Sequence, residues 1–116
     1  MRKHTIFAYV SAPHVEGNDL LTLQAISYCK DLYDMGFIPI CPALMFSQFL
    51  NDGVPQERES KQEMSLNLLR RCRVLVVCGN EVTDEMEREI LLAKRLNIVS
   101  TTFGGIERLS IYSRLG

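Results

Sequence analysis

The sequence lacks any long hydrophobic run. No stretch of it approaches the roughly 18 apolar residues that a membrane-spanning helix requires. The apolar residues 5–10 follow the basic start Arg2-Lys3-His4, but they are too few for the core of a secretion signal. We therefore expect a cytoplasmic location and no membrane partner.

An excess of charge of one sign is also missing. The chain has 13 Lys and Arg against 14 Asp and Glu, which gives a net charge of −1. Proteins that bind nucleic acid present a basic field to the phosphates, and this composition offers none. The balance predicts that nucleic acid is not a partner.

Paired C-x-x-C spacing is absent as well. The four cysteines all lie in apolar surroundings, at Cys29, Cys41, Cys72 and Cys78. This usage is typical of reduced, buried thiols in a cytosolic protein. His4 and His14 show no clustered spacing with the thiols. We expect no metal site and no cofactor.

What the sequence does contain is a regular alternation of apolar and amphipathic segments. Its 116 residues suffice for one domain over 1–116. Strands are expected at 5–10, 37–41, 74–78 and 97–103. Helices are expected at 18–35, at 55–72 and from 83 onward, with a short terminal helix or tail at 106–114 after a break at Gly104-Gly105.

Strands that alternate with helices at this spacing indicate βαβ units. The fold class predicted is α/β, with a single doubly wound, Rossmann-like parallel sheet of four or five strands in the order 2-1-3-4. Pro39 removes a backbone donor and therefore places the second strand at a sheet edge.

Ligands of such sheets bind beyond the C-terminal strand ends, where the strand order reverses. Three segments leave those ends, namely 11–18, 42–52 and 79–89. We expect them to converge on one crevice, where the candidate contacts that they contribute include Asn18, Gly79 and Met86.

A carboxylate falls on the apolar side of the helix that begins after Thr83, a residue type that caps helices. At about 100° per residue, Glu89 shares a broad face with Val82, Met86, Ile90, Leu92, Ala93 and Leu96. Burying a carboxylate costs on the order of several kcal/mol of folding free energy unless the group is paired or serves a function. Glu89 is therefore the first candidate for chemistry, and an ion pair with an arginine is the alternative. Glu85 shares the face, but its first-turn position complements the helix dipole.

Aromatic and basic side chains near the crevice are further candidates. Phe46 and Phe49, in the long connection 42–55, can stack on a base, although such aromatics commonly line cores. Arg58 can hold a phosphate bidentately or lie on a solvated helix face. Glu57 and Lys61 are spaced for a surface pair.

Several short motifs, taken together, resemble a known family. They are Tyr9-Val10-Ser11-Ala12-Pro13, Ile38-Pro39-Ile40, Phe46-Ser47-Gln48-Phe49-Leu50-Asn51-Asp52, Pro55-Gln56-Glu57-Arg58 and Glu89-Ile90-Leu91-Leu92-Ala93. In this order, over residues 5 to about 103, the chain resembles nucleoside 2-deoxyribosyltransferases and the related deoxynucleoside 5′-monophosphate N-glycosidases.

The resemblance implies roles for the matching residues. Glu89 corresponds to the nucleophile of a Glu-x-x-x-Ala helix start, which attacks the anomeric carbon and forms a glycosyl-enzyme that water or a second base resolves. Tyr9 corresponds to the tyrosine that positions the nucleophile. Thr83 corresponds to a residue that contacts the sugar hydroxyl or phosphate, as suits a helix N-terminus. The residues that match a loop around the sugar or phosphate are Ser11, Pro13, His14 and Gly17.

Two positions depart from the family pattern. Relatives place an acid, which helps to protonate the leaving base, 24 positions before the nucleophile, where Ser65 stands here. Relatives also begin this helix with Ser-x-Gly-Met, and here Glu85 replaces the glycine. Loss of a general acid typically removes ~10²–10⁴-fold of rate.

The sequence leaves four hypotheses about function. The first is an N-glycosidase or deoxyribosyl-transfer enzyme acting on a nucleoside or nucleotide, and the second is a module that binds or sequesters a nucleotide with little turnover. The third is a structural or regulatory domain without a ligand site, and a faint fourth rests on the likeness of Gly104-Gly105 to phosphoribohydrolases. The resemblance also implies at least a homodimer, in which a tail bearing Ser110, Tyr112 and Ser113 completes a neighbour's pocket.

Overall fold

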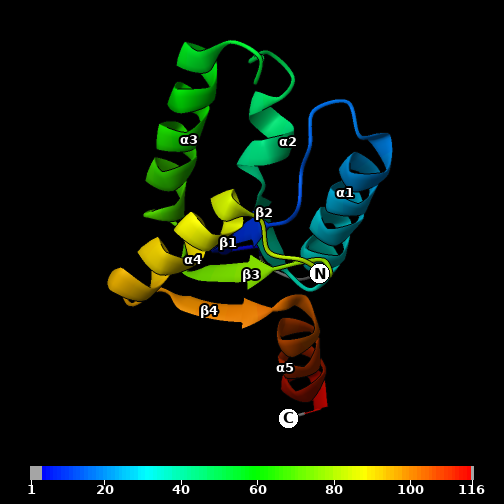
Figure 1. Cartoon of the computed structure of the whole chain (residues 1–116). Helices are drawn as coiled ribbons and strands as arrows, with labels where there is room; N and C mark the ends of the chain where they lie inside the picture. Colours follow the sequence, from blue (N-terminus) through cyan, green and yellow to red (C-terminus); the bar gives the residue numbers. More distant parts are fainter. Residues whose placement is uncertain (1–3, 116) are drawn as a thin grey trace.

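The computed structural model describes residues 4–115, and the side chains of residues 4–109, as a parallel sheet enclosed by helices (Figure 1). The four strands are β1 (Ile6–Ser11), β2 (Phe37–Ile40), β3 (Val74–Val77) and β4 (Val99–Thr102). They pair in the order β2-β1-β3-β4, and every pair is parallel. The predicted α/β fold and strand order are confirmed, and Pro39 lies in edge strand β2 as expected.

Helices cover both faces of this sheet, as a doubly wound fold requires. They are α1 (Asp19–Asp34), α2 (Pro42–Phe46), α3 (Pro55–Leu69), α4 (Asp84–Arg95) and α5 (Phe103–Leu115). The alternation of β1 explains the two layers: Ala8 packs with Leu32 of α1 and Ile106 of α5. Tyr9, the next residue, packs on the opposite face with Leu69 of α3. Ala93 of α4 joins the second cluster.

The predicted helix starts carry the expected caps. The Asn18 side chain accepts a hydrogen bond from the Leu21 N–H at 3.1 Å, and Thr83 Oγ1 accepts one from the Met86 N–H at 3.2 Å. Gly36 follows α1 with a φ of +99°, a conformation that glycine adopts without strain and that ends the helix.

Three predicted boundaries are wrong. The connection 42–55 contains α2, which Pro42 begins at a position where its missing N–H is not needed. Helix α3 ends at Leu69, and Cys72 is buried in the turn beyond it. Gly104 and Gly105 do not break the chain before a helix, because both lie in the first turn of α5.

Some predicted buried positions are also wrong. Along α3, Leu69 is buried in the core, whereas Met64 is 37 % exposed, although its position on the helix is that of an inward-facing residue. Val82 and Leu96, which the apolar arc included, lie just outside the two ends of α4 and are exposed, whereas Met86, Leu92 and Ala93 within the helix are buried. An amphipathic arc reaches the sheet only over its middle turns, and its ends remain in solvent.

The topology fixes where a ligand would bind. The chain runs from β1 outward to β2 and then returns to the other side of β1 as β3, so the order reverses between β1 and β3. Ser11 and Val77 are register partners at the C-terminal ends of these strands. Between residues 4 and 115, no helix is both long enough and apolar enough to cross a membrane.

Candidate functional site

Glu89 is held by two hydroxyl groups from the end of β1. The Tyr9 hydroxyl donates to Oε2, and the Ser11 hydroxyl donates to Oε1 at 2.7 Å. Both donors are buried, each with only 1 % of its surface exposed. Among the described side chains, ion pairs join Lys30 to Asp34 and Lys61 to Asp52. Within this part of the chain, Glu89 therefore forms no ion pair with an arginine, which was the alternative to a role in chemistry.

The surroundings of Glu89 shift its proton affinity in opposite directions. Burial is the largest effect and raises the pKa of Glu89, while the hydrogen bonds from Tyr9 and Ser11 oppose that rise. The charge of Glu85 adds to it. Burial and the neighbouring Glu89 also raise the pKa of Tyr9 far above its usual value, which keeps the phenol protonated and able to donate. The site thus pairs a half-buried carboxylate with fixed donors.

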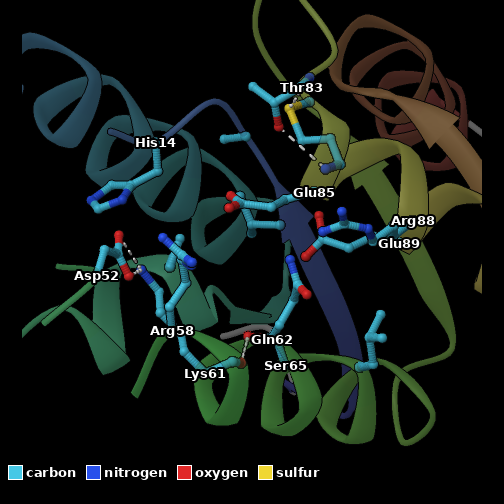
Figure 2. A pocket seen from close by; sticks show the side chains of 15 residues that line it. His14, Asp52, Arg58, Lys61, Gln62, Ser65, Thr83, Glu85, Arg88 and Glu89 are labelled. Carbon is cyan, nitrogen blue, oxygen red and sulfur yellow. Dashed lines mark hydrogen bonds and ion pairs between the residues drawn. The ribbon is translucent and has the colours of Figure 1, made fainter. Parts of the chain in front are cut away.

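Glu89 borders a small pocket beyond the strand ends (Figure 2). We call it the inner pocket; its enclosed volume is about 50 Å³. Its lining consists of Val10, Ala12, His14, Ala43, Asp52, Arg58, Lys61, Gln62, Ser65, Leu66, Thr83, Glu85, Met86, Arg88 and Glu89.

A larger space adjoins it, which we call the outer hollow, with a volume of about 610 Å³. It is lined by His14, Pro55, Arg58, Glu59, Gln62, Thr83, Asp84, Glu85 and Arg88, most of which also line the inner pocket. Pockets for small ligands typically measure ~300–1,000 Å³. The outer hollow is of that size, and of the two spaces it is the inner pocket that Glu89 lines.

Side chains of both charges line these spaces. Lys61 is only 14 % exposed and lies 3.2 Å from an oxygen of Asp52, which neutralises it. Burial, followed by the charge of Lys61, lowers the pKa of His14, so that its imidazole is neutral at pH 7. The guanidinium groups of Arg58 and Arg88 remain as cations bordering both spaces.

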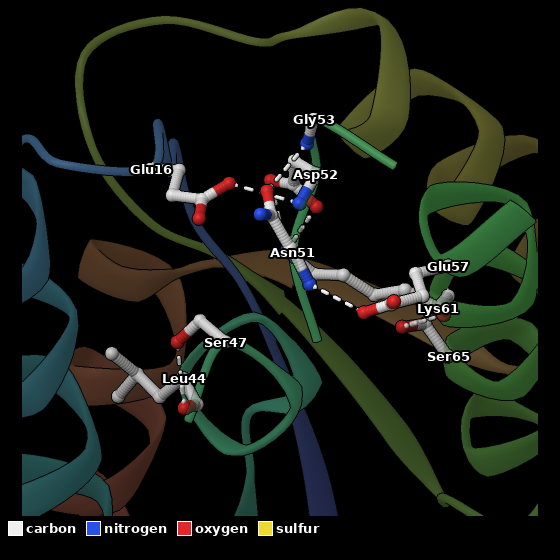
Figure 3. A network of polar contacts seen from close by, with 9 residues as sticks. All are labelled: Glu16, Leu44, Ser47, Asn51, Asp52, Gly53, Glu57, Lys61 and Ser65. Atoms are coloured by element: carbon white, nitrogen blue, oxygen red, sulfur yellow. Dashed lines mark hydrogen bonds and ion pairs between the residues drawn. The ribbon is translucent and has the colours of Figure 1, made fainter. Parts of the chain in front are cut away.

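A polar network holds the wall that carries Asp52 (Figure 3). The backbone N–H of Asp52 donates to Glu16 at 2.9 Å, and the N–H of Asn51 donates to Glu57 at 2.9 Å. The Asn51 side chain accepts from the Gly53 N–H at 2.7 Å. The predicted Glu57–Lys61 surface pair is therefore wrong, because each partner is engaged by the loop 51–53 instead.

The structure brings together part of the predicted site. Tyr9 and Ser11 contact Glu89 directly. Four further predicted residues line the inner pocket, namely His14, Arg58, Thr83 and Met86. Ser11 faces the carboxylate through its hydroxyl, and Thr83 uses its own hydroxyl to cap α4.

The other predicted contacts have different positions, outside the lining of the inner pocket and the outer hollow. Phe46 is 7 % exposed in the core, and Phe49, which is 66 % exposed, packs its ring edge-on against that of Phe46. Asn18 serves as the cap of α1. Pro13 is buried against Gly79, where an added Cβ would lie 2.9 Å from the proline ring. Gly79 therefore has a packing role, with a φ of +96°.

Sequence reasoning missed most of the pocket's α3 wall. Arg58, Lys61, Gln62 and Ser65 are spaced i, i+3, i+4 and i+7, and Figure 2 shows them on one side of the pocket. That polar stripe was the available signal, but charged residues at this spacing usually mark a solvated face. Arg88, an exposed residue of α4, also borders both spaces, and it was not singled out from the sequence.

The thiols and imidazoles gather into no obvious metal site. Among the described residues, no group of three or more His, Cys, Asp or Glu side chains could hold a metal ion. All four cysteines are free; Cys72 and Cys78 are buried, and Cys29 and Cys41 are half-buried. The tail residues Ser110, Tyr112 and Ser113, expected to complete a neighbour's pocket, lie outside the side chains that the structure describes.

Comparison with known proteins gives one match. Residues 6–103 match the family described as Domain of unknown function (DUF7768). A search of curated proteins finds no match. The matched segment includes every strand and the helix that carries Glu89.

Proposed function

We propose a function for this chain, which belongs to the DUF7768 family of domains of unknown function. It cleaves the N-glycosidic bond of a nucleoside or nucleotide, or transfers the (deoxy)ribosyl group to another base. One observation carries the proposal: the half-buried Glu89 carboxylate, held by Tyr9 and Ser11, borders a recess at the strand-order reversal. The resemblance to nucleoside 2-deoxyribosyltransferases, which rests on these same residues, supports the same chemistry.

The reaction uses Glu89 as a nucleophile. One of its oxygens attacks the anomeric carbon of the sugar, and the base leaves from an oxocarbenium-like transition state. Water or a second base then displaces Glu89 from the covalent glycosyl-enzyme. Tyr9 and Ser11 keep the carboxylate oriented throughout, since both hydroxyls come from the rigid end of β1.

The proposal is tested by product analysis. The protein is incubated with a panel of ribonucleosides, 2′-deoxynucleosides and their 5′-monophosphates, and free base is quantified by liquid chromatography. We expect release or exchange of base by the parent protein. Glu89→Gln should lower the rate at least about 10³-fold, because the amide is a poor nucleophile.

Glu87→Gln is the matched control, because Glu87 is an exposed acid on the same helix that lines neither space. It should retain the parent rate. Equal activity of the parent and Glu89→Gln on every panel member would refute the proposed function.

A second candidate function is binding or sequestration of a nucleotide without efficient turnover. It is favoured by the outer hollow, which has the size of a ligand pocket, whereas the recess next to Glu89 encloses only about 50 Å³. Ser65, in place of the acid of the resembled family, also lines that recess. Calorimetry with the same panel decides this: heat of binding with chemically unchanged ligand supports sequestration.

The remaining expectations belong to the same proposal. We propose a cytoplasmic protein that forms a homodimer or a larger homo-oligomer. Light scattering coupled to size-exclusion chromatography measures the molar mass directly. A monodisperse peak at the 13.2 kDa of a single chain would contradict the oligomer.

A further inference from the structure

Two of the four cysteines border one hollow of the surface. Cys29 belongs to α1, and Cys41 stands between β2 and α2, at the N-cap position of α2. Both are half-buried, and both line an open hollow of about 420 Å³ beside Leu44 and Met45 of α2. Both also pack against the core cluster on the α1 face of the sheet. The fold therefore places the two thiols together where a small molecule can reach them.

The two thiols interact directly, and they differ in proton affinity. Hydrogen bonding from the Cys41 thiol favours the thiolate of Cys29 and lowers the pKa of Cys29. The same hydrogen bond, followed by burial, raises the pKa of Cys41 far above its usual range. Cys41 therefore keeps its proton and donates it to Cys29. A thiol with an increased thiolate fraction beside a second thiol is the arrangement found in redox-sensing cysteine pairs.

The remaining two cysteines have the surroundings of inert thiols. Cys72 is 6 % exposed, and burial raises its pKa to about 11. Cys78 is completely buried, and burial, followed by the charge of Cys29, raises its pKa to about 12. Their sulfurs donate to the carbonyl oxygens of Leu68 and Val76, and neither lines the hollow. Buried thiols in apolar surroundings react slowly, so the chain contains its own controls.

We propose that Cys29 and Cys41 form an oxidation site at which a hydroperoxide produces a reversible disulfide. The Cys29 thiolate attacks one peroxide oxygen. An S–O bond forms, the O–O bond breaks, and the departing oxygen takes a proton from solvent. The Cys41 sulfur then attacks the sulfenic sulfur of Cys29 and passes its proton to the hydroxyl group, which leaves as water.

This chemistry oxidises the two sulfurs and reduces the peroxide, and it uses no residue of the reaction proposed for Glu89. A thiol such as glutathione reduces the disulfide again by exchange. Disulfides in reducing compartments are usually transient ones of this kind.

The test exposes the reduced protein to a small excess of hydrogen peroxide, then unfolds it in guanidinium with iodoacetamide to block the remaining thiols. Intact mass and a peptide map identify the products. We expect blocked thiols at Cys72 and Cys78 and one cross-linked pair of peptides that joins Cys29 to Cys41. Dithiothreitol added before the blocking step should restore all four thiols.

Single variants assign the order of the steps. Cys41→Ser should stop at the sulfenic acid, which dimedone traps at Cys29. Cys29→Ser should leave Cys41 reduced, because the attacking thiolate is missing. Cys72→Ser is the matched control, and it should form the Cys29–Cys41 disulfide at the rate of the parent. Circular dichroism shows whether each variant is folded.

A measurement on the parent alone also decides the proposal, in case a serine variant does not fold. Cys29 in the native protein should react with iodoacetamide at least about 10-fold faster than Cys72 and Cys78, because its thiolate fraction is larger. Equal reactivity of these thiols would overturn the proposal. So would a disulfide from Cys29 to Cys78, or four reduced thiols after the peroxide treatment.

Discussion

Two hydroxyl donors offset part of the cost of burying the Glu89 charge, and each can be removed singly. Tyr9 comes from the buried face of β1 and Ser11 from its last position, so both are fixed by the sheet. Hydrogen bonds to a charged group contribute ~1.5–3 kcal/mol each. These two bonds both orient the Glu89 carboxylate, the proposed nucleophile, and lower its pKa against the effect of burial.

Tyr9→Phe removes one donor and leaves the ring in the core. We expect the turnover rate to fall about 10–100-fold, which corresponds to ~1.5–3 kcal/mol. Because the Tyr9 hydrogen bond lowers the pKa of Glu89, its loss raises that pKa further. The acidic limb of the kcat/KM profile should therefore move to higher pH, since only the ionised carboxylate attacks.

The measurement is a pH–rate profile of parent and Tyr9→Phe with the best panel substrate. Tyr28→Phe is the control, because Tyr28 packs against Phe103 in the core cluster on the other face of the sheet. A Tyr9→Phe profile with an unmoved acidic limb would show that the tyrosine does not tune Glu89.

At the scale of the elements, the two glycines at the start of α5 have different roles. A Cβ on Gly105 would lie 2.4 Å from Thr101 Oγ1 and 3.2 Å from Thr102 Oγ1, both at the end of β4. A Cβ on Gly104 would meet only a guanidinium nitrogen of Arg108, at 3.8 Å. Gly105 therefore lets the first turn of α5 approach the strand that it follows.

Gly105→Ala should destabilise the fold by ~1–3 kcal/mol, the usual cost of forcing atoms into a packed contact. Gly104→Ala is the matched control, and it should be neutral or stabilising by ~0.5–1 kcal/mol because alanine favours a helix over glycine. Urea unfolding followed by circular dichroism measures both. Equal stabilities of the two variants would mean that α5 does not need this close approach.

The helices and strands with long hydrophobic patterns could be predicted from the sequence, and the short ones could not. The apolar runs that became β1 and β3 and the long arcs of α1 and α4 have clear periods, and the strand order followed from them. Helix α2 has five residues, too few to show a helical period. The Gly104-Gly105 pair was taken as a break because nothing local reveals that Thr101 packs against it.

The same limit applies to the site. Glu89 could be found because a carboxylate on an apolar arc is unusual, and Tyr9 followed from the resemblance as its partner. Ser11, its second partner, was predicted to lie in a loop around the sugar or phosphate instead. The α3 stripe that ends at Ser65 could not be recognised, because only the placement of α3 beside α4 turns it toward the pocket. Phe46 and Phe49 were assigned to the crevice since their connection leaves a strand end, but α2 turns Phe46 into the core.

At the scale of the whole molecule, burying Glu89 sets function against stability. Burial raises its pKa in the folded chain above the ordinary value of 4.5. The folded state therefore binds this proton more tightly than the unfolded state. The stability that the proton contributes is complete below the unfolded pKa and is lost as the pH rises through the folded pKa. At neutral pH the ionised carboxylate is a cost to the fold.

Glu89→Gln should consequently unfold at a higher urea concentration than the parent at pH 7. Its amide retains an oxygen that can accept from one hydroxyl, and it carries no charge to bury. The difference should shrink as the pH falls toward 4.5, where the parent carboxyl takes up its proton. Urea titrations of parent, Glu89→Gln and the exposed control Glu87→Gln at several pH values between these limits measure it. A variant that is less stable than the parent at pH 7, or a difference that does not change with pH, would contradict the argument that the fold gives up stability to keep this carboxylate at the strand ends.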